Sequence, residues 1–173
     1  VYGIGLKEID VEGRVIRAEY DNLNVYSVYF PSGSSGDLRQ HYKMRFLNFF
    51  EKFIKTQKGS MLISGDYNIC HKPIDIHDPI RNKNSSGFLP EERKWVSLFL
   101  ELGFIDTFRE KHKNPDNYTW WSYRARSRER NKGWRIDYHM ITKKDVNRIQ
   151  QALILKDVKH SDHCPIYVEI KLI

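Results

Sequence analysis

The sequence has few of the residues that cross-link or anchor a protein. Its two cysteines, Cys70 and Cys164, match neither a zinc site nor a disulfide framework, which is typical of a reducing intracellular compartment. No apolar run approaches the roughly 18 residues of a membrane span, and the sequence shows no basic-then-apolar leader. We therefore expect a cytoplasmic protein that has no membrane partner.

Acidic residues are outnumbered by basic ones. The 29 lysines and arginines stand against 22 aspartates and glutamates, which gives a formal net charge of +7. Such a surface favours anionic partners such as nucleic acid, although a basic protein without that partner would show the same balance. The length fits one ordinary domain and no repeat or linker divides the chain, so residues 1–173 are expected to form a single domain.

Alternation of apolar and polar residues predicts several strands. Residues 15–20 and 23–29 alternate on either side of Asp21-Asn22, which predicts a β-hairpin. Residues 60–65 form a short apolar run that ends at Gly65 and is typical of a buried strand. We expect further strands in four later segments: 118–124, 133–142, 151–158 and 164–173.

The spacing of large apolar residues predicts two helices. The first carries aromatic residues from Tyr42 to Phe53 and ends near Gly59. The second begins at Pro90, has acidic residues in its first turn and ends at Gly103. Strands with intervening helices predict a layered α/β arrangement of the α+β class.

Polar side chains that follow or interrupt the predicted strands are the candidate chemical groups. Asp66 and Asn68 follow a buried strand, but an ordinary turn explains such a pair equally well. Asp137 falls inside a predicted strand, where an unpaired carboxylate would cost several kcal/mol. His163 is a suitable partner, because an Asp-His pair fixes the imidazole tautomer and leaves its other nitrogen free for a phosphate or a water.

The composition of this set indicates the chemistry. Aspartate, asparagine and histidine without thiols are hard ligands, which favour Mg²⁺ or Mn²⁺ over zinc. Combined with a basic surface, they indicate cleavage of a phosphate ester.

Seven motifs resemble those of one enzyme family. They are VYFPSG, SGDYNICH, SSGFLPEER, DTFRE, YTWWSYR, NKGWRIDY and SDHCPI. Their order and separations resemble the exonuclease III family of AP endonucleases, within the endonuclease/exonuclease/phosphatase superfamily that includes DNase I. The resemblance runs from Tyr2 to the C-terminus. The GF-x-PEER, YTWWSY and GWRIDY blocks are far more specific than GD-x-N or SDH.

The resemblance implies a DNase I-like four-layer α/β/β/α sandwich. Members of the family begin with a strand that bears an asparagine and a second strand whose glutamate binds the metal, and neither motif is present here. We therefore expect a fold truncated at the N-terminus, without these metal-binding strands, that corresponds to about the C-terminal two thirds of the enzyme. One sheet would lack strands, and its exposed apolar surface would favour dimerisation or aggregation.

The resemblance also implies a role for each candidate catalytic residue. Tyr29 would support the transition-state phosphorane, Asp66 would orient or deprotonate the attacking water, and Asn68 would hold that water and a phosphate oxygen. Asp137 would orient His163, which would contact the scissile phosphate. The implied ligands of Mg²⁺ or Mn²⁺ are Asp66, Asn68, Asp162 and His163.

A basic segment with flanking tryptophans is the candidate DNA surface. A solvated charged loop is the simpler interpretation of such a run, but neighbouring aromatic planes suit tracking of a phosphate backbone. By resemblance, two tryptophans and an isoleucine would line a pocket for a flipped abasic deoxyribose. Two positions depart from the family: Ser32 and the Ser85-Ser86 pair each stand where relatives keep an asparagine. The candidate DNA contacts are Asn82, Asn84, Trp120, Tyr123, Arg124, Arg128, Trp134 and Ile136.

The resemblance implies a Mg²⁺-dependent DNA phosphodiesterase of base excision repair. It would cleave 5′ to abasic sites and degrade DNA from 3′ ends, with double-stranded DNA as its partner, and this chain alone would be impaired. Two alternatives stay open: a superfamily phosphodiesterase that acts on lipid or inositol phosphates, and a catalytically inactive DNA-binding module.

Overall fold

The computed structural model describes residues 1–172, which form two β-sheets and the helices around them. The strands of the large sheet, in the order β1-β2-β3-β5-β4, are β1 (Val15–Tyr20), β2 (Leu23–Tyr29), β3 (Met61–Asp66), β5 (Asp137–Thr142) and β4 (Phe104–Asp106). The small sheet pairs β6 (Ile149–Ile154) with β7 (Ile166–Ile170). The helices are α1 (Lys7–Asp10), α2 (Asp37–Thr56), α3 (Pro90–Glu101) and α4 (Thr107–Lys111), with 3₁₀ turns η1 (Pro73–Asp75), η2 (Arg124–Arg126) and η3 (Lys143–Arg148).

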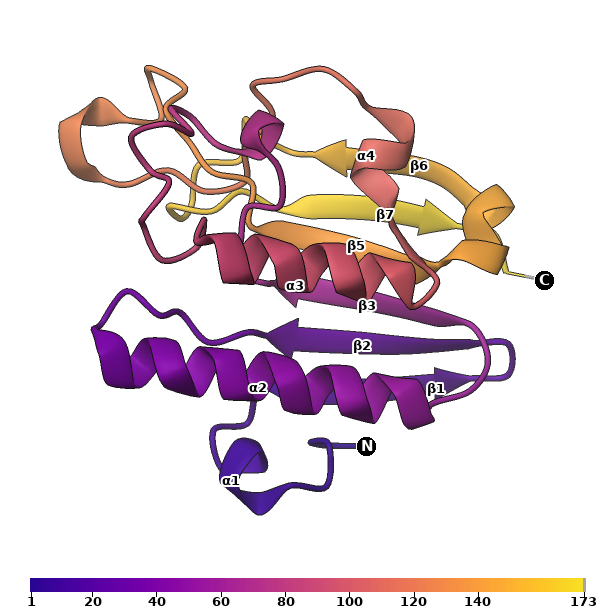
Figure 1. The fold of residues 1–173 in the computed structure, drawn as a ribbon. Coiled ribbons are helices and arrows are strands. Elements are labelled where there is room, and N and C mark those ends of the chain that lie inside the picture. Colours follow the sequence, from indigo (N-terminus) through magenta and orange to yellow (C-terminus); the bar gives the residue numbers. More distant parts are fainter. Residues whose placement is uncertain (173) are drawn as a thin grey trace.

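Helices α2 and α3 lie side by side on one face of the large sheet (Figure 1). Their aromatic side chains pack on residues of β2, β3 and β5, and Phe30 stacks at 4.2 Å on Tyr67 just beyond the strand ends. Burial of large aromatic side chains dominates the stability of such a core. This layer confirms the two predicted helices, although α2 begins five residues before Tyr42.

The opposite face of the large sheet changes from apolar to polar along the strands. Residues in register on neighbouring strands point to the same face. One row, Val25, Leu62 and Ile141, packs against the small sheet. The next rows toward the ends of β2 and β3 are Ser27, Ser64 and His139, then Tyr29, Asp66 and Asp137. The polar rows therefore lie beside the apolar layer between the two sheets.

The small sheet leaves part of this face exposed. On β1, Ile16 is 45% exposed and Tyr20 is 60% exposed, and Ala18 between them is also exposed. The exposed apolar surface expected from the sequence is therefore present on β1. None of the helices in the described part of the chain is long and apolar enough to cross a membrane.

Two strand predictions were wrong. Residues 118–124 form no strand. The side chains of Tyr118 and Trp121 are buried in a small cluster, and the backbone of Trp120 makes only isolated bridges, to Trp134 and His163. The predicted strand 133–142 begins only at Asp137, so this carboxylate stands at the start of β5 rather than in its middle. The carboxylate of Asp137 is therefore only partly buried.

Candidate active site

Four segments distant in sequence meet at one end of the molecule. Strands β2 and β3 end there, while β5 and β7 begin there, next to the long loops (Figure 1). Tyr29 is in register with Asp66, and Asp66 is in register with Asp137, so the two carboxylates share one face of the sheet. Tyr29, at the outer end of this row, is 53% exposed and lies under the guanidinium of Arg14 at 4.8 Å.

The turn after β3 fixes Asp66. Gly65 has φ 146°, and a Cβ at this position would lie 1.9 Å from the carbonyl oxygen of Val28, so only glycine allows the strands to approach this closely. Asn68 adopts the left-handed conformation with φ 53°. Its backbone N–H donates to Asp66 Oδ1 at 2.7 Å, and its side-chain Nδ2 donates to Asp66 Oδ2 at 3.0 Å. Both oxygens of Asp66 are thereby oriented.

A buried ion pair that sequence reasoning missed supports this turn. Lys43 and Glu92 are fully buried, with Lys43 Nζ 2.5 Å from Glu92 Oε1, and Lys43 Nζ also donates to the carbonyl of Asn68 at 2.8 Å. Glu92 accepts from the backbone N–H of Gly87 at 2.6 Å. A signal was available, because Lys43 stands at helical spacing from the buried Phe46.

Asp66 is held in an environment that resists its ionisation. Burial and the nearby negative charge of Asp137 raise the pKa of Asp66 to about 7, against the opposing effects of the Asn68 N–H and of the positive charges on His163 and Lys43. Two carboxylates on one face repel each other when both are ionised. A positive charge placed between them would relieve that repulsion.

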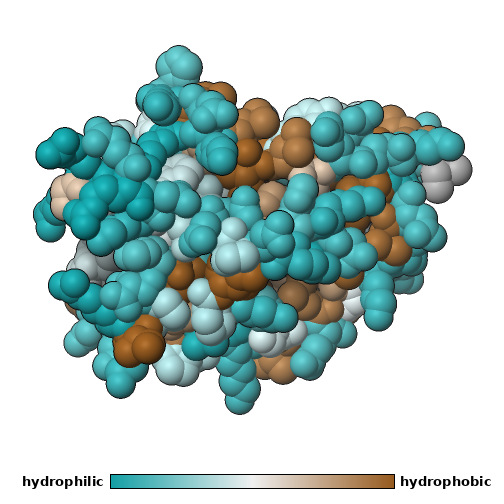
Figure 2. Space-filling model, turned by 90° about the horizontal axis from the view of Figure 1, so that it is seen from above, coloured by the Kyte–Doolittle hydropathy of each residue, from teal (hydrophilic) through white to brown (hydrophobic). Residues whose placement is uncertain are grey.

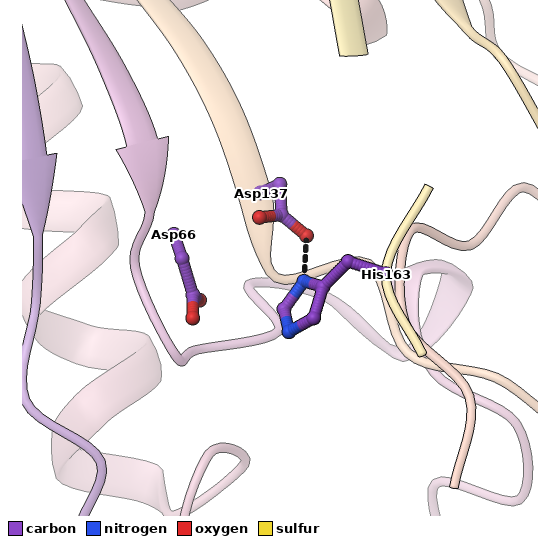
Figure 3. Close-up of side chains that lie close together, drawn as sticks. All are labelled: Asp66, Asp137 and His163. Carbon is purple, nitrogen blue, oxygen red and sulfur yellow. Dashed lines mark hydrogen bonds and ion pairs between the residues drawn. The ribbon is translucent and has the colours of Figure 1, made fainter. Parts of the chain in front are cut away.

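Asp137 and His163 form a hydrogen-bonded pair. The distance from His163 Nδ1 to Asp137 Oδ2 is 2.9 Å, and Figure 3 shows the second ring nitrogen turned to the side on which Asp66 lies. Burial disfavours the charged ring, but the hydrogen bond and charge of Asp137 outweigh it and raise the pKa of His163. The pairing expected from the sequence is thus present, and it leaves Nε2 free to contact a ligand.

Asp66, Asp137 and His163 form a group that could hold a metal ion, with one ligand atom from each within 4.8 Å of the others. Asp162, expected as a ligand, lies outside this group. Its Oδ2 accepts from Trp120 Nε1 at 2.9 Å and its Oδ1 accepts from the Ser161 hydroxyl at 3.0 Å. These contacts hold the carboxylate of Asp162 against the Trp120 indole, and the group contains Asp137 beside Asp66 and His163.

Two of the expected DNA contacts are engaged within the protein. Arg128 donates to the backbone carbonyls of Ser161, Lys156 and Val158 at 2.6 to 3.0 Å, and its guanidinium lies 4.6 Å from the Trp121 ring. Arg128 therefore anchors the segment that carries the Ser-Asp-His triplet. The side-chain Nδ2 of Asn82 similarly donates to two backbone carbonyls of its own loop.

The other expected DNA contacts divide into an exposed set and an apolar set. Tyr123 is 80% exposed, and Arg124 and Asn84 are also exposed. Figure 2 shows hydrophilic residues gathered at the end of the molecule that carries the long loops.

The apolar set lies beside His163. Trp120 and Trp134 meet edge to face at 6.0 Å, and both pack against the buried Ile136. Gly87 is in contact with this set, since a Cβ there would come within 2.9 Å of the Trp134 ring. An apolar surface therefore adjoins the polar row of Asp66 and Asp137.

Comparisons with known proteins give concordant matches. A model of the Endonuclease/Exonuclease/phosphatase family matches residues 3–163. The exodeoxyribonuclease of Bacillus subtilis (strain 168) is 42% identical over 177 residues, which cover 99% of this chain and 69% of that protein. The DNA repair nuclease APEX1 of Danio rerio is 36% identical over 170 residues, which cover 95% of this chain and 54% of that protein.

Solved structures share the fold. An AP endonuclease from Archaeoglobus fulgidus matches with a TM-score of 0.90 at 29% identity, covering 99% of this chain and 70% of that one. A 3′ phosphatase from Neisseria bound to a product DNA hairpin matches with a TM-score of 0.89 at 25% identity over the same shares. These matches confirm the layered α+β fold and the resemblance to AP endonucleases found in the motifs. They show that the chain belongs to the endonuclease/exonuclease/phosphatase family.

Proposed function

We propose that residues 1–173 form a single domain that carries the active site of a Mg²⁺- or Mn²⁺-dependent DNA repair nuclease. The enzyme would cleave 5′ to abasic sites and degrade DNA in the 3′-to-5′ direction. The group formed by Asp66, Asp137 and His163 carries this proposal, because it unites two carboxylates and an oriented imidazole at the loop end of the sheet. Relatives named as an exodeoxyribonuclease and a DNA repair nuclease support it.

The residues at this site fit a hard divalent cation. Their donors are carboxylate oxygens and an imidazole without thiols. Burial and the repulsion by Asp137 raise the pKa of Asp66, and a bound cation would offset both effects. Asp66 and Asp137 would hold the ion through their carboxylates, with the amide oxygen of Asn68 and the carboxylate of Asp162 as further candidates. His163 would use Nδ1 for Asp137 and Nε2 for the phosphate. When bound, the ion would neutralise charge on the phosphate oxygens.

The side chains of this chain would perform the remaining steps. Asp66 would orient a water for in-line attack and accept its proton, while Asn68 would hold that water against the phosphate. Protonated His163, oriented by Asp137, would donate from Nε2 to a non-bridging phosphate oxygen. The hydroxyl of Tyr29 would stabilise the same developing charge from the end of β2.

The substrate would be double-stranded DNA that contains an abasic site or a 3′ end. Trp120, Trp134 and Ile136 would receive the deoxyribose of the abasic site, because their apolar surface adjoins His163. A pocket too small for a base would reject a nucleotide that keeps its base. The exposed Tyr123 and Arg124 would contact the DNA backbone, together with Asn84.

Cleavage of a fluorescent duplex with one abasic-site analogue tests this function. The chain spans 69% of the Bacillus relative, so the test compares it with a form extended to that relative's length. We expect Mg²⁺-dependent cleavage 5′ to the lesion by the extended form and slow cleavage by this chain. The variants Asp66→Asn and His163→Ala should abolish the cut, whereas Asp37→Asn, an exposed control, should not.

The possible failures of this experiment are distinguishable. Binding of the duplex without metal-dependent cleavage by the extended form would identify a DNA-binding module instead. Hydrolysis of a phospholipid or an inositol phosphate in preference to DNA would identify another phosphodiesterase. Full-rate cleavage by this chain alone would contradict the expected impairment.

We also propose that copies of this chain pair through the exposed face of β1. Ile16, Ala18 and Tyr20 give that face an apolar character, whereas the outer edge of β1 is already paired with residues 1–3. Sedimentation velocity should show a concentration-dependent dimer that Ile16→Lys disrupts, whereas Lys144→Glu at a distant exposed site should not. A monomer at all concentrations would contradict the pairing.

A further inference from the structure

Three buried polar atoms that lack a hydrogen-bond partner among the described residues belong to side chains that line one small cavity. They are Thr107 Oγ1, Arg135 Nη1 and His139 Nε2. Thr107 and Arg135 are each only 1% exposed. Buried polar groups are almost always hydrogen-bonded, and an unpaired one costs about 1–3 kcal/mol. The presence of three such atoms on residues that line one space therefore points to a ligand that they share.

The cavity lies where β5, the small sheet and α4 meet. Thr107 of α4, His139 of β5 and Arg135, which precedes β5, carry its polar atoms, and Asp137 is also part of its wall. The remaining wall is largely apolar and comes from Phe108, Leu153, Ile154, Ile166 and their neighbours on β6 and β7. Its volume is about 10 Å³, which is close to the minimum space for one water molecule.

Arg135 carries a buried donor that needs an acceptor in this cavity. Its Nε donates to Asp75 Oδ1 at 2.8 Å and its Nη2 donates to Asp106 Oδ2 at 2.6 Å, which leaves Nη1. A guanidinium keeps its proton in proteins, so Nη1 is always a donor that needs an acceptor. No apolar group could satisfy it, whereas a water oxygen could.

We propose that this cavity holds one internal water that accepts a hydrogen bond from Arg135 Nη1 and donates to Thr107 Oγ1 and His139 Nε2. This arrangement fixes the tautomer of His139, because Nε2 must then be bare. The hydrogen on Nδ1 donates to Ser64 Oγ at 2.7 Å.

The water would connect the buried cation to the polar rows beneath the active site. His139 and Ser64 form the row next to Asp66 and Asp137, and Asp137 lines the same cavity. Through these contacts the water would be a positioning element for the first residue of β5. This role goes beyond the proposed nuclease function and does not depend on it.

A high-resolution crystal structure of the wild-type chain is the first test. We expect a water peak within hydrogen-bonding distance of both Arg135 Nη1 and Thr107 Oγ1. ¹⁵N-detected imidazole spectra should independently show His139 with hydrogen on Nδ1 and a bare Nε2. A cavity without density, a side chain that fills it, or an Nε2–H directed at the Ile166 carbonyl would overturn the proposal.

Matched threonine variants provide the second test. Thr107→Val removes one acceptor, so the water peak should be lost and the His139 Nε2 resonance should move. Thr107→Ser should preserve both features, and Thr56→Val, which removes an exposed helix hydroxyl, should change neither. An unchanged water peak in Thr107→Val would overturn the proposal as stated. If Thr107→Val does not fold, the wild-type density and tautomer decide the question.

Discussion

The charge of a single carboxylate controls two neighbours at the candidate site. Asp137 raises both the pKa of His163, through a hydrogen bond, and the pKa of Asp66, through repulsion. We predict that Asp137→Asn lowers the pKa of both groups, since it removes the attraction on one and the repulsion on the other. An NMR titration of the His163 ring and the Asp66 carboxyl would measure this, with Asp37→Asn as a control. An unchanged or raised His163 pKa would contradict the electrostatic account.

A second histidine should affect stability rather than chemistry. Burial is the main reason that the pKa of His71 is lowered to about 4, and its Nε2 is 2.8 Å from the Ser97 hydroxyl. Above about pH 6.5 the ring is neutral in both states, so it makes no pH-dependent contribution. As the pH falls toward 4, the unfolded chain binds a proton that the folded chain excludes, and stability decreases by up to about 3 kcal/mol.

The variant His71→Gln isolates this effect. We predict that its unfolding free energy falls less steeply between pH 6.5 and pH 4 than that of the wild type, as measured by urea denaturation at each pH. His160→Gln, at an exposed position, should keep the wild-type slope. Parallel curves for wild type and His71→Gln would show that burial of His71 does not control its ionisation.

At the scale of elements, one buried arginine joins η1, α4 and β5. Arg135 contacts Asp75 and Asp106, while Asp106 Oδ1 also caps α4 by accepting from Phe108 N–H. Arg135→Met would remove a positive charge that neutralises Asp75 and Asp106. Loss of one partner from a buried ion network costs about 3–5 kcal/mol of folding stability. Urea unfolding should show a loss of this size, against about 1 kcal/mol or less for the exposed pair lost in Arg45→Met. Equal losses would contradict this role.

The elements also show what the sequence could and could not predict. The hairpin and both long helices followed from periodicity, because each buries one regular face, whereas β3 followed from its continuous apolar run and extends one residue further, to Asp66. The segment 118–124 looked like a strand because its aromatic residues resemble β-formers, yet they are buried in an irregular cluster. The start of β5 was missed for a similar reason: Trp134 pairs with Ile76 and Trp120 through isolated bridges. Such long-range partners leave no local pattern.

The site was predicted in the same uneven way. Motif resemblance indicated Asp66, Asp137 and His163, supported by the strand that precedes Asp66 and by the need of a carboxylate within a strand for a partner such as His163. The sequence could not show that Asp162 accepts a hydrogen bond from the Trp120 indole, or that Arg128 donates its hydrogen bonds to backbone carbonyls. Both contacts depend on how distant loops fold together. For Lys43 the helical spacing from Phe46 was the only signal, and it was overlooked because a lysine in a helix is usually solvated.

At the scale of the whole molecule, the formal charge of +7 and the hydrophilic loop end predict DNA binding that is dominated by phosphate contacts. The logarithm of the binding constant should fall linearly with the logarithm of salt concentration, by about 0.9 for each phosphate neutralised. We predict that Arg124→Gln, at an exposed position, reduces the magnitude of this slope by about 0.9 without changing the thermal midpoint.

Arg128→Gln should behave in the opposite way, which makes the pair diagnostic. Its guanidinium is bonded to three backbone carbonyls, so its removal should lower the thermal midpoint, whereas the salt slope of the folded protein should stay close to wild type. Fluorescence anisotropy with an abasic duplex over a salt series, combined with thermal unfolding, would measure both quantities. Arg45→Gln on α2 serves as the control for loss of a distant positive charge. A salt slope smaller by about 0.9 at an unchanged thermal midpoint in Arg128→Gln would contradict this prediction. The wild-type guanidinium would then face DNA, and other residues would anchor the Ser-Asp-His segment.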